Sequence, residues 1–148
     1  MIELQKDIYF SSKNEDMNLD TIYSVISSSY WGRSRSFEEQ KTAFQHSINF
    51  GLFYNNNQIA YARVMTDHVF FAYLLDVFVI EQHQGKGYST LLIDKILNNP
   101  ELKNIDKWML ATKDAHKLYE KFGFETIKDS SKLMDKMSVR AKNIFEQK

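Results

Sequence analysis

The sequence contains no cysteine, one proline and five glycines among its 148 residues. Without cysteine the chain has no disulfide framework, no thiol nucleophile and no thiolate metal site. The one proline, Pro100, ends a predicted helix and does not mark a linker. Long apolar runs are also missing, because the longest, residues 69–79, is interrupted by Asp76 and is too short to span a bilayer.

An excess of charge of either sign is equally absent, since 19 Lys and Arg residues balance 19 Asp and Glu residues. This balance gives no indication of a nucleic-acid or membrane partner. The N-terminal residues are charged and lack the apolar core of a signal peptide, so we expect a cytoplasmic protein. The four histidines are not at ligand spacing, so we expect no metal site. The length suits one domain, residues 1–148, with a normal core.

The apolar spacing predicts a mixed α/β chain. Ser36 followed by Glu39 is a capping-box pattern, and it predicts a helix that reaches about residue 48. Residues 55–57 are asparagines, which tolerate left-handed backbone geometry and predict a hairpin turn. Residues 133–145 fit either a strand or a helix. Further helices are predicted at 19–28, 88–98 and 115–122, and strands near the N-terminus and at 50–54, 58–65, 69–80, 107–112 and 124–127.

A glycine-containing turn follows the apolar strand 69–80 and precedes an amphipathic helix. The first amides of a helix lack intrahelical partners, and the helix dipole adds positive potential there, so a phosphate commonly binds. The pattern is neither a P-loop nor the dinucleotide fingerprint, because it lacks the required glycine and lysine positions. On its own it leaves two interpretations open, a phosphate site and an ordinary strand-turn-helix corner. The turn consists of Gln84, Gly85, Lys86, Gly87, Tyr88 and Ser89.

These six residues resemble the Gln/Arg-x-x-Gly-x-Gly/Ala signature of the GNAT superfamily, the acyl-CoA N-acyltransferases. A second segment resembles the superfamily's Ala-x-x-Leu-Tyr-x-x-x-Gly-Phe signature. The two segments occur in the expected order and cover residues 74–127. Ser89 replaces the usual glycine or alanine, and Thr112 replaces an asparagine found in many members. The second segment contains Ala115, Leu118, Tyr119, Gly123 and Phe124.

The resemblance implies a single-domain, three-layer α/β/α fold with a mixed, splayed central sheet of about seven strands, the last near residues 134–139. It implies an N-acetyltransferase that moves the acetyl group of acetyl-CoA to a primary amine of a small molecule or peptide, within a ternary complex and without a metal. The alternatives are another acyl-CoA donor or a non-catalytic acyl-CoA-binding sensor. The implied cofactor-binding residues are Val77, Phe78, Val79, Gln84, Gly85, Lys86, Gly87, Tyr88, Ser89, Thr112 and Ala115.

Two residues are candidates for catalysis. Tyr119 matches the family's tyrosine near the cofactor sulfur, and a phenol of pKa about 10 can protonate a leaving thiolate. Its other interpretation is a packed aromatic residue. Asp76 is a carboxylate within an apolar strand. It is either a base whose pKa burial raises, or a structural carboxylate that is paired with Arg63 or capped by backbone amides.

The acceptor site is expected between the first two helices and the splayed strands. Aromatic and arginine residues in that connection suit a planar or anionic ligand. The alternative is a structural loop with Trp31 in the core. The sequence does not identify the amine, nor does it distinguish a monomer from a homodimer. The expected acceptor-binding residues are Tyr30, Trp31, Arg33 and Arg35 from the loop, and Tyr61 and Arg63 from the facing strand.

Overall fold

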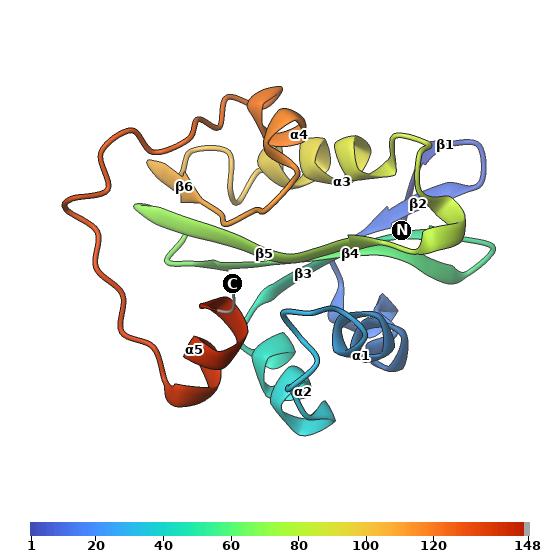
Figure 1. Ribbon diagram of the computed structural model, residues 1–148. Coiled ribbons are helices and arrows are strands. Elements are labelled where there is room, and N and C mark those ends of the chain that lie inside the picture. The colour runs from blue at the N-terminus through green and yellow to red at the C-terminus, as the bar shows by residue number, and fades with distance from the viewer. Residues whose placement is uncertain (147–148) are drawn as a thin grey trace.

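A single sheet organises the computed structural model, which describes residues 1–146 (Figure 1). Its strands follow one another across the sheet in the order of the chain, and each neighbouring pair is antiparallel except the last, β5 and β6, which is parallel. The strands are β1 (Ile2–Gln5), β2 (Ile8–Ser11), β3 (Ile48–Tyr54), β4 (Asn57–Thr66), β5 (Phe71–Val79) and β6 (Lys107–Met109).

Helices cover both faces of this sheet and give the molecule the predicted three layers (Figure 1). One face carries α1, α2 and the C-terminal helix α5, and the other carries α3 and α4. Short 3-10 turns occupy Asn14–Asp16 and Glu81–His83. No helix within residues 1–146 combines the length and the apolar character that a membrane crossing requires. The helices are α1 (Leu19–Ser27), α2 (Phe37–Gln45), α3 (Tyr88–Leu97), α4 (His116–Glu120) and α5 (Val139–Phe145).

Two local signals in the sequence act as predicted. The Ser36 hydroxyl accepts a hydrogen bond from the Glu39 amide, and the Glu39 carboxylate accepts one from the Ser36 amide, so the capping box opens α2. Asn55 and Asn56 adopt positive φ angles of 50° and 63° in the turn between β3 and β4. Asparagine tolerates this left-handed conformation better than other non-glycine residues, which fixes the hairpin register.

The sheet separates two apolar clusters. The larger lies against α3 and includes Leu92, Ile93 and Ile96, which are fully buried. The smaller lies against α1 and α2 and is built on Ile22 and Tyr61. Trp31 packs at the edge of this second cluster, so the loop between α1 and α2 is anchored to the core.

The pairing between β5 and β6 is short, and this leaves part of β5 without a neighbouring strand. Only Phe71, Ala72 and Tyr73 of β5 pair with β6. Beyond them β5 continues to Val79 while the chain after Met109 leaves the sheet. The edge of β5 that faces residues 110–115 is therefore unpaired, and the sheet is splayed as predicted.

The C-terminal part differs from the prediction. Within residues 1–146 the sheet has six strands, one fewer than expected. Residues 124–127 form no strand, and the strand predicted at 134–139 is wrong. Instead the Ser138 hydroxyl accepts a hydrogen bond from the Ala141 amide and begins α5. A local helix cap needs no neighbouring strand, whereas the exposed Leu133 and Met134 have no strand beside them to pair with.

Candidate active site

A cleft of about 580 Å³ opens where β5 and the chain after β6 diverge. Tyr119 and Ala115 reach it from the α4 side of the sheet, whereas Tyr30, Trp31 and Arg35 reach it from the α1–α2 side. The cleft is therefore lined by residues from both sides of the sheet. Residues 73–77 of β5 form one wall, and beyond Tyr73 this stretch is unpaired. Its free backbone groups can pair with an extended ligand, as in strand addition.

The glycine turn ends β5 and presents free amides at the start of α3. No amide from Gly85 to Thr90 donates a hydrogen bond to any residue between 1 and 146. Gly85 and Gly87 have φ angles of 77° and 83°, and a Cβ on either would meet nothing within 4 Å. Such unpaired, accessible amides at a helix start form an anion site. The residues present therefore fit the pyrophosphate of an acyl-CoA.

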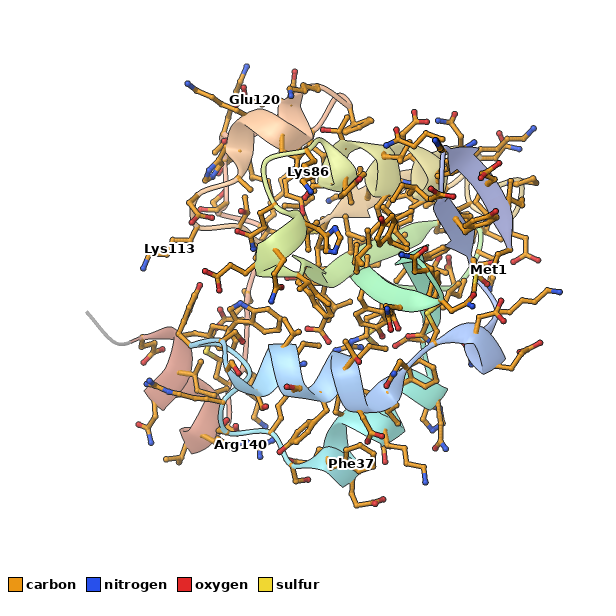
Figure 2. The ribbon with its side chains drawn as sticks, turned by 90° about the vertical axis from the view of Figure 1, so that its right-hand side faces the viewer. Met1, Phe37, Lys86, Lys113, Glu120 and Arg140 are labelled. Carbon is orange, nitrogen blue, oxygen red and sulfur yellow. The ribbon has the colours of Figure 1, made fainter. Side chains whose placement is uncertain are left out.

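The turn is also held firmly to the strand. The side-chain amide of Gln84 donates a hydrogen bond to the Val79 carbonyl oxygen over 2.9 Å. Gln84 thus fixes the turn to the end of β5. Lys86 is exposed, and Figure 2 shows it on the α3 side of the sheet, opposite Arg140.

Tyr119 lies on the cleft wall with its ring buried. Its side chain packs edge-on against Phe124, with the ring centroids 5.8 Å apart. Only 7% of the residue is exposed, and burial raises the pKa of the Tyr119 hydroxyl. This hydroxyl makes no hydrogen bond to any residue in the described range, so it remains a free donor at the cleft. Thr112, which also lines the cleft, accepts a hydrogen bond from the Ala115 amide over 3.0 Å.

Asp76 forms the centre of a buried polar cluster. Its Oδ2 atom accepts hydrogen bonds from Arg63 Nε at 2.6 Å, Arg35 Nη1 at 2.9 Å and Gln40 Nε2 at 3.3 Å. Burial alone would raise the pKa of Asp76, but the charges of Arg63 and Arg35 outweigh it and hold the pKa below its ordinary value. The expectation of a raised pKa is therefore wrong, and the alternative pairing with Arg63 is what the structure contains.

A bulge in β5 places this carboxylate. Tyr61 pairs with Phe78 but Arg63 pairs with Leu75, so β5 has one residue more than β4 at this point. Asp76 lies within this irregularity and has a φ angle of 57°. Bulges re-aim side chains and occur near active sites, and a non-glycine residue at positive φ costs about 1–3 kcal/mol. The cluster of arginines stabilises Asp76 against this strain.

The predicted acceptor residues divide into two groups. Tyr30, Trp31 and Arg35 line the cleft, as does Asp76. Arg33 is exposed and does not line the cleft.

Tyr61 and Arg63 are also absent from the cleft wall. The Tyr61 hydroxyl donates a hydrogen bond to Asn49 Oδ1, and burial raises its pKa. Both residues lie on the face of β4 that α1 and α2 cover, so they support the site from the core.

Sequence reasoning missed two residues. Gln40 is fully buried and contacts both Asp76 and Arg35. The sequence feature that could have identified Gln40 is a polar residue between Phe37 and Phe44 on the apolar face of α2. Phe145 on α5 lines the cleft as well, but nothing near it in the sequence indicates this position. Within residues 1–146 no three His, Asp or Glu side chains gather to hold a metal ion.

The unpaired edge of β5 and the buried Tyr119 lie at one cleft, and the anion-binding start of α3 lies outside its lining, where β5 ends. This is the arrangement that the resemblance to the acyl-CoA N-acyltransferases implies. The chain belongs to the acetyltransferase (GNAT) family, whose model matches residues 17–124.

Individual relatives agree with this assignment. The N-acetyltransferase ycf52 of Pyropia yezoensis, which is uncharacterised, is 31% identical over 132 residues, 84% of this chain and 72% of that protein. The crystal structure of a GNAT-family protein from Xanthomonas campestris pv. campestris is 35% identical and has a TM-score of 0.85, covering 88% of this chain and 93% of that one. A predicted acetyltransferase from Clostridium acetobutylicum, solved with acetyl-CoA, shares the fold at 15% identity and a TM-score of 0.66, covering 90% of this chain and 97% of that one.

Proposed function

We propose that this protein is an acetyl-CoA-dependent N-acetyltransferase that transfers the acetyl group directly to a primary amine in a ternary complex. The observation that carries the proposal is the cleft lined from both sides of the sheet, which brings Tyr119 from one face and the α1–α2 loop from the other to one space. Donor and acceptor would then enter from opposite faces and meet there. The acetyl-CoA in the Clostridium acetobutylicum relative supports this choice of donor.

The donor is proposed to lie along β5 and to end at the glycine turn. The backbone of Val77, Phe78 and Val79 would pair with its pantetheine arm, because the edge of β5 is free beyond Tyr73. The amides from Gly85 to Ser89 would bind its pyrophosphate, each charge-assisted hydrogen bond contributing about 1.5–3 kcal/mol. When bound, acetyl-CoA supplies the acetyl group as a thioester.

Two proton transfers accompany the reaction. An alkylammonium acceptor of pKa about 10.4 must lose a proton, at a cost of about 4–5 kcal/mol at pH 7. Asp76 is a poor base because two arginines share its Oδ2 atom and hold its pKa low, so we assign this proton to water. The Tyr119 hydroxyl, kept protonated by burial, donates its proton to the departing thiolate.

Binding of acetyl-CoA tests the proposal directly. At about 100 times its dissociation constant, acetyl-CoA should stabilise the folded protein by roughly 2.7 kcal/mol, measured as a rise in melting temperature. Propionyl-CoA and succinyl-CoA, compared in the same assay, test the other donors. Release of free thiol in the presence of a panel of amines then separates an enzyme from a sensor. If acetyl-CoA produces neither a thermal shift nor calorimetric heat, the proposal fails.

Substitution of Gly87 by glutamate should weaken acetyl-CoA binding at least about tenfold, the effect of losing one charge-assisted contact. The new carboxylate would lie among the free amides and repel the phosphates. Nothing lies within 4 Å of a Cβ at this position, so the domain should still fold. Isothermal calorimetry with acetyl-CoA measures the effect.

Gly123→Glu is the matched control for this substitution. Gly123 also has a positive φ, of 90°, and open space around a Cβ, but it lies after α4 and away from the turn. The control should therefore show a similar loss of stability and an unchanged affinity. Full affinity in a folded Gly87→Glu variant would place the phosphates elsewhere.

A further inference from the structure

The guanidinium of Arg35 has donors that the protein does not use. Both of its hydrogen bonds leave from the Nη1 atom, to Asp76 Oδ2 at 2.9 Å and to Gln40 Oε1 at 3.0 Å. Neither Nε nor Nη2 contacts an acceptor within residues 1–146. An arginine carries five N–H donors, and the edge formed by Nε and Nη2 is one that binds a carboxylate or phosphate with two hydrogen bonds.

The buried cluster around Asp76 also carries a surplus of positive charge. Arg35 and Arg63 both bind the same carboxylate, so two positive charges share one negative charge. The side chain of Arg63 is 7% exposed, whereas that of Arg35 is 23% exposed and lines the cleft. At the cleft wall Lys113 and Asp114 offset each other. The charged residues that line the cleft are therefore balanced, and the surplus positive charge comes from Arg63, which lies in the core beside Asp76.

The position of Arg35 is fixed before any ligand binds. The Tyr23 hydroxyl donates a hydrogen bond to the Arg35 carbonyl oxygen, and the Arg35 amide donates one to the Gly32 carbonyl oxygen. A Cβ on Gly32 would lie 2.4 Å from the Ile26 carbonyl oxygen, so this close turn requires glycine. The guanidinium also lies over the Trp31 ring, 5.4 Å from its centroid. A donor edge held in this way loses little entropy when it binds an anion.

We infer that the acceptor of the proposed reaction carries an anionic group, a carboxylate or a phosphate, in addition to its amine, and that the free edge of Arg35 binds this group. The inference rests on the proposed function and defines its substrate class. Tyr30 and Trp31, which line the same part of the cleft, would pack against the carbon chain between the two groups. Arg35 then selects which amines are acetylated without contacting the reacting atoms.

The test compares acceptors that differ only in charge at the far end. A series of ω-amino acids of increasing chain length is compared with the corresponding amides, and ω-aminoalkyl phosphates with the corresponding amino alcohols. In the longer members of each series the amine pKa is nearly equal within a pair, so these members carry the comparison. Free thiol release from acetyl-CoA gives kcat/KM for each compound. For at least one chain length we expect the anionic member to be preferred about tenfold or more, the effect of one charge-assisted contact. The carboxylate and phosphate arms distinguish the two anions.

Three variants assign the preference to a residue. Arg35→Gln should reduce it to near one and leave the KM for acetyl-CoA unchanged. Arg35→Lys keeps the charge beside Asp76 and so protects folding, but it lacks the two-donor edge and should also lose most of the preference. Arg33→Gln, in the same loop but outside the cleft, is the matched control and should retain it. Melting temperatures establish that each variant is folded.

The outcomes separate this inference from the proposed function. Absence of acetyl-CoA binding contradicts both. Equal turnover of anionic and neutral amines by the wild-type protein, or a preference that survives Arg35→Gln in a folded variant, overturns the inference alone. Loss of the preference in Arg33→Gln also overturns it. If acetyl-CoA binds but no amine of the series is acetylated, binding of the same pairs to the coenzyme A complex is measured by calorimetry. Equal heats for the anionic and neutral members, or no heat for either, overturn the inference.

Discussion

Substitution of Tyr119 by phenylalanine should lower kcat by about 10²–10⁴-fold, the range expected when a general acid is lost. Phenylalanine keeps the ring that packs against Phe124 and removes only the hydroxyl at the cleft. The affinity for acetyl-CoA should therefore change little. Steady-state kinetics with a saturating amine measure the effect on kcat, and calorimetry with acetyl-CoA measures the binding.

The raised pKa of Tyr119 adds a pH dependence to this prediction. Burial favours the neutral phenol, so the wild-type hydroxyl should remain a proton donor up to and beyond its ordinary pKa of about 10. Tyr9→Phe, at an exposed position of β2 on the far side of the sheet from β6, is the control and should have full activity. An unchanged kcat in Tyr119→Phe would assign thiolate protonation to water and leave Tyr119 with a packing role.

Local signals in the sequence determined most of the fold. The Ser36 capping box, the asparagine turn and the glycine turn each act through backbone contacts a few residues apart, so they can be identified without a tertiary structure. The C-terminal strands could not be identified in this way. A strand forms only beside another strand, and residues 124–127 have none to pair with. Further along the C-terminal part, the local cap at Ser138 begins a helix in place of the expected strand.

The site shows the same division between local and distant contacts. Arg33 and Arg35 are equivalent in the sequence, and only the folded loop determines which of them lines the cleft. Tyr61 and Arg63 share one face of β4, as their spacing predicts, but α1 and α2 cover that face. The direction of the pKa shift of Asp76 depends on a competition between burial and two arginines, which the sequence cannot resolve.

The Asp76 cluster links the stability of the fold to the acceptor site. One carboxylate holds Arg63 in the core and Arg35 at the cleft wall, and these two side chains come from β4 and from the α1–α2 loop. Loss of the carboxylate would leave two like charges close together, one of them almost fully buried. Removing one partner of a buried ion pair typically destabilises a protein by about 3–5 kcal/mol.

Asp76→Asn should therefore lower the free energy of unfolding by about 3–5 kcal/mol at neutral pH, measured by urea denaturation. The folded-state pKa of Asp76 is depressed, so its contribution is complete above the ordinary carboxyl pKa of about 3.9 and is lost as the pH falls through the lower folded value. The difference in stability between the wild-type protein and the variant should accordingly shrink in acid. Asp135→Asn, at an exposed position, is the control and should change stability by less than about 0.5 kcal/mol. A stable Asp76→Asn protein with a much lower kcat would instead support the role of a catalytic base.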